Sequence, residues 1–384
     1  MRRADATQRL RAVQATRSPG ALVQWLDDQS PEVVRAAIVR LVDLEGQRAA
    51  GALRARLFDV DLSLVADVAG ALGQIGDRRA AEVAIKALRD GRYSRRLAAV
   101  RALGALGDPR AAQCLRTMLD DDVAGVRGAA LDALAKPGPH VDGDGADCAR
   151  LLVDPAAHVR IAAVRAVARL VKHPGAMLAP AVKDKDRLVR LEVARHAAGL
   201  PERAANTLLG DPDLRVREAA ARGAGVRELG VLAVLLTDDP AGDVRRASAH
   251  TLGAMRGERV ADVLVPGVED PDALVRAAVL HALETLLTRE TAVGRLCDEL
   301  TSERPERRRA SVYALAHLSA GEAAPALSRL VDDSDPDVRL ALVHSAEALF
   351  ERPEPLMRYL AADADPAVRQ GAEMWLLRAR GRRS

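Results

Sequence analysis

A short motif recurs at nearly constant spacing through this chain, and this repetition constrains the fold more than any other feature. Clear copies read Asp-Pro-x-x-x-Val-Arg, at residues 211–217 and 270–276, and shorter-linked copies begin at Asp335 and Asp365. Aligned on the residue before Arg, the twelve copies lie 27 to 33 residues apart, at Val34, Leu64, Arg95, Val126, Val159, Val189, Val216, Val244, Val275, Arg307, Val338 and Val368. A repeat of this length predicts a solenoid, in which each unit is stable only against its neighbours.

Each copy predicts two helices. Apolar or small residues follow the aligned position at +3, +4, +7 and +8, as Ala278, Val279, Ala282 and Leu283 follow Val275, and this spacing forms one face of a helix. A shorter helix is expected before each turn. The Asp of the Asp-Pro pair is expected to cap the second helix, where Pro is tolerated in the first turn. The predicted fold is therefore all-α, an α-solenoid of about twelve stacked two-helix repeats.

The residue after the aligned position is Arg in eleven of the twelve copies, and only Val65 departs. A guanidinium can bridge the turn Asp of its own repeat and that of the adjacent repeat, so we predict that these Arg residues have a structural role. Arg217→Ala is accordingly expected to destabilise the chain rather than only weaken binding.

The Asp-Pro turn, the Val-Arg pair, the small residue at +4 and the Leu at +8 resemble the HEAT-repeat family, in particular the short bacterial HEAT-like units of about thirty residues. The resemblance implies that the Val-Arg helices line a concave side and that turn Asp and helix Arg form a ladder. We expect one HEAT-like solenoid over 1–384, with an N-terminal cap at 1–20, repeats over 21–377, a loop insertion near 135–147 and a basic tail at 378–384. Function does not follow, because one fold hosts many tasks.

Composition excludes several classes of protein. Aromatic residues make up 2 % of the chain and the net charge is +3, which is weak for a nucleic-acid-binding protein. The three Cys residues are far apart and form no Cys-x-x-Cys pair, as expected of free thiols in a reducing cytosol. No signal peptide and no apolar stretch of about 20 residues is found, so we expect a cytoplasmic protein that does not enter membranes. Nucleophile-elbow and phosphate-loop motifs are also absent, so no enzyme is expected.

Metal and cofactor sites are not expected either. His250, His281 and His344 occur once per repeat. Neighbouring helices lie ~10 Å apart and zinc–nitrogen bonds are ~2 Å, so these residues are poorly placed to share an ion. The His-Glu pairs of the di-iron HEAT-repeat hydroxylases are absent. The segment 142–147 lacks the carboxylates that a calcium loop needs at its fifth and twelfth positions.

A candidate binding surface lies on the second helices. Positions +2 and +6 after the aligned residue point away from the buried stripe and form one ridge. We name this set the ridge residues: Arg40, Leu97, Arg101, Ile161, Arg165, Leu191, Arg195, Arg222, Arg246, His250, His281, Arg309, Tyr313 and His344. A mixed basic and aliphatic ridge suits an acidic or amphipathic protein segment, and Arg is favoured at interfaces. A solvated surface without a partner remains the alternative interpretation.

The leading prediction is a non-catalytic scaffold or adaptor that binds a protein partner in its concave groove. Nucleic-acid binding through a basic concave face is the main alternative, although low charge and few aromatic residues weigh against it. An accessory subunit resembling the HEAT-like bilin lyases is a further alternative. Replacing Arg165, Arg195 and Arg222 by Glu is expected to abolish partner binding without unfolding. Partner identity and oligomeric state do not follow from the sequence.

Overall fold

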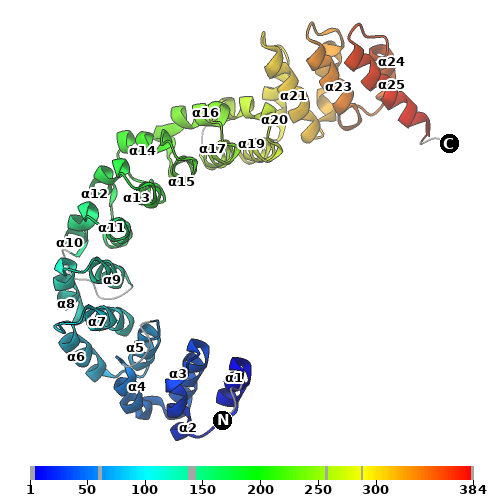
Figure 1. Ribbon diagram of the computed structural model, residues 1–384. Coiled ribbons are helices and arrows are strands. Elements are labelled where there is room, and N and C mark those ends of the chain that lie inside the picture. The colour runs from blue at the N-terminus through cyan, green and yellow to red at the C-terminus, as the bar shows by residue number, and fades with distance from the viewer. Residues whose placement is uncertain (1–4, 59–62, 137–143, 256–257, 287–288, 382–384) are drawn as a thin grey trace. The chain divides into compact units, whose positions relative to one another are not determined.

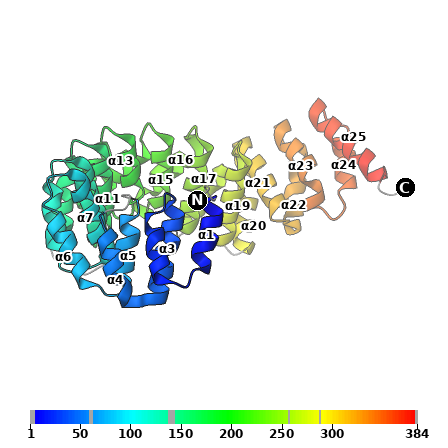
Figure 2. The same ribbon diagram turned by 60° about the horizontal axis from the view of Figure 1, so that its bottom comes forward.

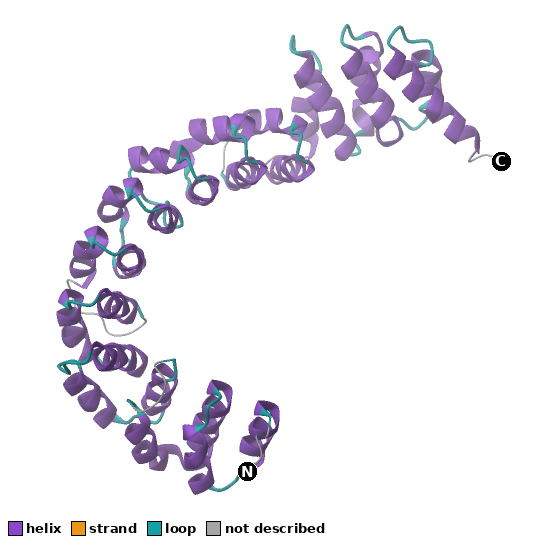
Figure 3. Cartoon of the chain, in the orientation of Figure 1, coloured by secondary structure: helices purple, strands orange, loops and turns teal. Residues whose placement is uncertain are grey.

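The computed structural model describes residues 5–58, 63–136, 144–255, 258–286 and 289–381. Every regular element among them is a helix, and Figure 3 shows these helices joined by turns and short loops. The predicted all-α class is confirmed. The chain divides into two compact units, Met1–Pro201 and Glu202–Ser384, which are described separately. A single uninterrupted solenoid over the whole chain stays a prediction.

Unit 1 consists of two layers of helices. Figure 1 shows one layer along the inner side of the curve of this unit and the other layer along its outer side. The inner layer contains α1 (Ala6–Ala15), α3 (Pro31–Glu45), α5 (Val65–Gln74), α7 (Tyr93–Leu106), α9 (Ala124–Leu134), α11 (Ala157–Leu170) and α13 (Arg187–Ala194). The outer layer contains α2 (Pro19–Gln24), α4 (Ala50–Arg56), α6 (Arg78–Ala87), α8 (Ala111–Thr117), α10 (Asp144–Ala149) and α12 (Gly175–Leu178), with 3₁₀ turns at Trp25–Asp27, Gly46–Ala49, Met118–Asp120, Arg150–Val153 and Ala179–Lys183.

Unit 2 repeats the same alternation. The Val-Arg helices are α15 (Leu214–Gly223), α17 (Gly242–Ala254), α19 (Ala273–Leu286), α21 (Pro305–His317), α23 (Pro336–Leu349) and α25 (Pro366–Gly381). Their partners are α14 (Glu202–Leu209), α16 (Leu229–Asp238), α18 (Glu258–Leu264), α20 (Arg289–Glu299), α22 (Ala324–Leu327) and α24 (Glu354–Leu360), with 3₁₀ turns η6 (Val226–Glu228), η7 (Val265–Glu269), η8 (Gly321–Ala323) and η9 (Ser328–Asp332). Figure 2 shows α21, α23 and α25 following one another in chain order, and α23 contacts both of the others.

The core runs between the layers and between successive repeats. The aligned Val residues are buried, including Val126, Val159 and Val275, each 0 % exposed. Complete burial of such a side chain contributes about 1.5–3 kcal/mol. Small residues let the helices approach closely. A Cβ atom added to Gly104 of α7 would lie 2.7 Å from the Cβ atom of Ala133 in α9. The Ala- and Gly-rich composition is therefore what allows these short helices to stack.

The predicted Arg ladder is present in both units. In each complete rung, Nε and Nη2 of the Arg donate to the two carboxylate oxygens of an Asp in the next repeat, at 2.6–3.0 Å. Nη1 donates to a backbone carbonyl of the turn in its own repeat. The described rungs are Arg96–Asp121, Arg127–Asp154, Arg160–Asp184, Arg217–Asp239, Arg245–Asp270, Arg308–Asp333 and Arg339–Asp363. The Arg thus meets its own turn through a carbonyl oxygen rather than a carboxylate.

The helix caps correct one expectation. Asp335 caps α23 as predicted, because its carboxylate accepts the backbone N–H of Asp337 at 2.8 Å. In the longer-linked copy the cap of α15 is Asp213, which accepts from the N–H of Arg215. The predicted cap, Asp211, instead accepts from the N–H of Asp213. Two extra residues place Asp211 in the turn, so the capping prediction is wrong for that copy.

The predicted N-terminal cap and the predicted basic tail both contain helical residues. Within the predicted N-terminal cap, α1 packs on α3, and its Arg9 pairs with Asp28 as a ladder rung does. Most of the predicted insertion, residues 137–143, lies outside the described residues, and α10 begins at Asp144. Helix α25 continues to Gly381, so described residues of the predicted basic tail are helical.

Candidate functional site in the inner layer of unit 1

None of the fourteen ridge residues is buried. Seven lie in unit 1, from Arg40 to Arg195, and seven lie in unit 2, from Arg222 to His344. Each half is therefore considered within its own unit.

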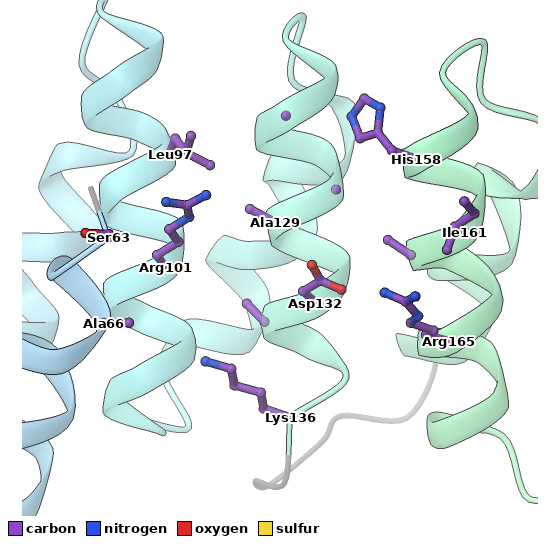
Figure 4. Close-up of a pocket in the computed structure, with 14 residues that line it drawn as sticks. Ser63, Ala66, Leu97, Arg101, Ala129, Asp132, Lys136, His158, Ile161 and Arg165 are labelled. Atoms are coloured by element: carbon purple, nitrogen blue, oxygen red, sulfur yellow. The ribbon is translucent and has the colours of Figure 1, made fainter. Parts of the chain in front are cut away.

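Four ridge residues of unit 1 share one cavity. Leu97 and Arg101 extend from α7, and Ile161 and Arg165 extend from α11 (Figure 4). The cavity has a volume of about 740 Å³, and its lining residues lie on or next to the inner-layer helices α5, α7, α9 and α11. We name it the inner groove, and its lining is Ser63, Ala66, Leu97, Arg101, Gly125, Gly128, Ala129, Asp132, Ala133, Lys136, His158, Ile161, Ala162 and Arg165.

The floor of the inner groove is formed by small residues of the middle helix, α9. Gly128, Ala129 and Ala133 line it there, so the α9 backbone is close to the groove surface. Half-buried Leu97 and Ile161 provide an aliphatic wall on either side. Such a surface can accept the apolar side chains of a peptide, because removing aliphatic area from water is favourable.

The charged residues of the inner groove surround one carboxylate. Figure 4 shows Asp132 on α9 between Arg101 on one side and Arg165 on the other, with Lys136 at the end of the same helix. The Asp132 side chain reaches solvent, yet surrounding protein atoms desolvate it and raise its pKa, against the lowering effect of Arg165, Lys136 and Arg101. Asp132 and Lys136 were not predicted as site residues. Asp132 occupies a +6 position, so the repeat alignment could have identified it.

Arg165 and Arg195 also bind a buried carboxylate. Nε of Arg165 donates to Oε1 of Glu192 at 2.9 Å, and Nη1 of Arg195 donates to Oε2 at 2.9 Å. Glu192 is 6 % exposed. Burial opposes its ionisation, but His196 and the two Arg residues outweigh burial and lower its pKa to about 2. Both Arg residues therefore contribute to folding, and replacing Arg165 by Glu is no longer expected to leave the fold intact.

The ridge residues of unit 2 are less concentrated. The Tyr313 hydroxyl lies 3.3 Å from Nδ1 of His344, and Nη1 of Arg309 donates to Asp337 at 3.1 Å. Arg222 pairs with Glu218 and Arg246 with Asp243 on their own helices. His250 and His281 are exposed. In the described part of the chain, no group of three His, Cys, Asp or Glu residues is arranged to hold a metal ion. None of the helices in that part is long and apolar enough to span a bilayer.

Comparison with protein families identifies the repeat. A family model for HEAT repeats matches residues 59–135, 202–284 and 293–377, together more than half of the chain. The chain belongs to the HEAT-repeat family. No curated protein matches the chain significantly.

Several solved structures are similar to this chain at low identity. An engineered protein is 20 % identical with a TM-score of 0.36, covering 92 % of this chain and 97 % of its own. The YibA protein of Escherichia coli is 17 % identical with a TM-score of 0.33, covering 79 % and 96 %. Human deoxyhypusine hydroxylase in complex with glycerol is 22 % identical with a TM-score of 0.25, covering 89 % and 97 %.

Proposed function

We propose that this HEAT-repeat protein is a non-catalytic scaffold whose inner groove holds an acidic, amphipathic segment of a protein partner. The observation that carries the proposal is the composition of the groove: Leu97 and Ile161 flank a floor of Ala and Gly, with Arg101, Lys136 and Arg165 around it. Apolar side chains of a peptide would contact the aliphatic walls, and its carboxylates would pair with the cations.

The partner chemistry follows from the same residues. Arg101, Lys136 and Arg165 would together attract a partner carboxylate, and Arg165 also holds Glu192, so the test below reverses the charges of Arg101 and Lys136 alone. Each has a long aliphatic stem that extends the apolar surface toward its charge. A peptide that carries carboxylates close to Leu or Val residues matches this arrangement. A reducing cytoplasm suits the three Cys residues, which form no disulfide with one another.

Nucleic acid is the weaker candidate for the inner groove. A phosphate backbone offers no apolar group to contact Leu97 and Ile161. The described lining contains no Phe, Tyr or Trp, so the imidazole of His158 is its one ring for base stacking.

The experiment is an affinity capture from native lysate with the full chain. The test variant is Arg101→Glu/Lys136→Glu, and the control is Arg79→Glu/Lys86→Glu, which makes the same charge change on the exposed face of α6 in the outer layer. Wild type and control are expected to capture the same protein, and the test variant to lose it. Capture that disappears on nuclease treatment would instead favour nucleic-acid binding, and equal capture by both variants would contradict the groove assignment.

A further inference from the structure

Among the described residues of unit 2, the ladder rung at Arg276 is incomplete. Arg276 of α19 occupies the ladder position, and its Nη1 donates to the carbonyl oxygens of Asp270 and Pro271 at 2.7 and 3.1 Å, as in the complete rungs. In the described residues, no carboxylate meets its Nε and Nη2 atoms. The same edge of Arg245 in the preceding repeat holds both carboxylate oxygens of Asp270.

A serine at position 302 explains why Arg276 has no carboxylate partner. In a complete rung, one Asp has two roles. The carboxylate of Asp239 accepts hydrogen bonds from the side chain of Arg217, and its backbone carbonyl accepts one from Arg245, six residues later. The equivalent carbonyl for Arg308 belongs to Ser302, which accepts a hydrogen bond from Nη1 of Arg308. Ser302 also keeps the local turn contact, since its hydroxyl accepts the N–H of Arg304. The residue that should face Arg276 therefore carries no charge.

Packing opens a cavity at the same place. On the side of the preceding repeat, helix α21 contacts η7, whereas α17 and α19 stack directly on one another. The cavity has a volume of about 350 Å³ and is lined by Val268, Arg276, Leu280, Arg309, Tyr313 and His317. Among these described lining residues none is acidic. The chain thus has a half-buried guanidinium beside an open space with further basic and hydroxyl groups.

We propose that this cavity binds a carboxylate of an extended peptide from a partner protein, which completes the Arg276 rung. The ladder itself provides the model: in each complete rung, two N–H groups of this edge donate to a planar carboxylate, a geometry that Arg provides and Lys does not. Val268 and Leu280 supply apolar contact for the stem or neighbour of the bound residue. The site lies within unit 2, so it does not depend on the function proposed for the inner groove.

Two variants test the site from opposite directions. Ser302→Asp supplies the missing carboxylate from the chain itself, and Arg276→Gln removes the guanidinium. The matched control is Arg369→Gln, which removes a ladder Arg that likewise donates to its own turn but belongs to the last repeat. The probe is a blocked peptide of alternating Glu and Leu, with the alternating Gln and Leu peptide and inorganic phosphate as comparison ligands.

Binding is followed in the full-length protein through the Arg276 Nε–H signal in ¹⁵N NMR, assigned by its loss in Arg276→Gln, and through peptide fluorescence anisotropy. We expect the Glu peptide to shift the Arg276 signal and the Gln peptide and phosphate not to shift it. Ser302→Asp is expected to raise the thermal midpoint and to abolish the shift. Ser302→Asp defines the part of Glu-peptide binding that occurs at this site. Arg276→Gln is expected to weaken that part about tenfold or more, whereas Arg369→Gln is expected to leave it unchanged.

Any of three results would overturn the proposal: an Arg276 response that survives in Ser302→Asp, a response to phosphate as strong as that to the Glu peptide, or equal loss of affinity in Arg369→Gln. If Arg276→Gln does not fold, the anisotropy of the Glu peptide still decides the question: in the Arg101→Glu/Lys136→Glu background, Ser302→Asp should abolish its binding, and unchanged binding would overturn the proposal. The Arg276 response should persist in Arg101→Glu/Lys136→Glu, so a failure of the inner groove and a failure of this site are distinguishable.

Discussion

Arg217 and Asp239 are joined by two parallel hydrogen bonds, Nε to Oδ2 at 2.7 Å and Nη2 to Oδ1 at 3.0 Å, although 22 residues separate them. The third nitrogen donates to the carbonyl of Asp211 in the turn of its own repeat. One side chain thus ties a helix to its own turn and to the next repeat. Since a solenoid has no contacts between distant repeats, such local ties determine its stability.

Removing this rung is expected to destabilise the protein. Arg217→Ala leaves the Asp239 carboxylate buried without its cation, at a cost of about 3 kcal/mol. The control is Arg215→Ala, because Arg215 is an exposed residue of the same helix. Urea unfolding followed by circular dichroism should give a lower midpoint for Arg217→Ala and a near wild-type midpoint for Arg215→Ala. Equal midpoints for the two variants would contradict a structural role for the ladder.

Acid should weaken the ladder. Burial of Asp184 opposes its ionisation, but hydrogen bonds from Arg160 and from the backbone of Asp186 outweigh burial and lower its pKa. A carboxyl group whose pKa is lower in the folded state stabilises the fold above its unfolded value, ~3.9, and loses this effect as the pH falls through its folded value. The thermal midpoint of wild type should therefore fall more between pH 5 and pH 3 than that of Asp184→Asn. A parallel decline of the two proteins would show that this rung adds no pH-dependent stability.

Arg165 and Arg101 should respond differently to charge reversal. Arg165→Glu removes one of the cations that lower the pKa of Glu192 to about 2 and places a second carboxylate beside it, so a marked fall in the thermal midpoint is expected. Arg101→Glu in the same groove makes no such buried contact with Glu192, and a smaller change is expected. Differential scanning fluorimetry compares the two, and an Arg165→Glu protein as stable as wild type would contradict the structural role of this pair.

Asp132→Asn should stabilise the protein slightly at neutral pH. A carboxyl group whose pKa is raised on folding destabilises the folded state when it is ionised. Removing its charge therefore stabilises the fold at pH values above its folded pKa and has no effect below its unfolded pKa. The variant should also bind an acidic partner more tightly, because a like charge leaves the inner groove. Thermal midpoints at pH 7 and pH 3 provide the check. A midpoint lower than that of wild type at pH 7 would contradict the desolvation of this group.

The repeat pattern was sufficient to predict the all-α fold, the pairing of helices and the Arg ladder. These depend on spacing and on one Arg per repeat, which the sequence displays directly. The capping role of Asp213 was missed because linker length decides which Asp precedes the helix. Lys136 was missed as a groove residue because it follows the last turn of α9 rather than occupying a ridge position. The pairing of Arg165 with Glu192 spans two repeats, and periodicity alone does not indicate which side chains of adjacent repeats meet.

The most direct test of the central claim is site-specific photocrosslinking in native lysate. A benzoylphenylalanine residue replaces Ile161 in the inner groove or, as the control, the exposed Val83 on outer helix α6. The account predicts a protein crosslink from position 161 that is absent from position 83 and is lost in the Arg101→Glu/Lys136→Glu background. Equal crosslinking from both positions, or a nuclease-sensitive product at position 161, would contradict it.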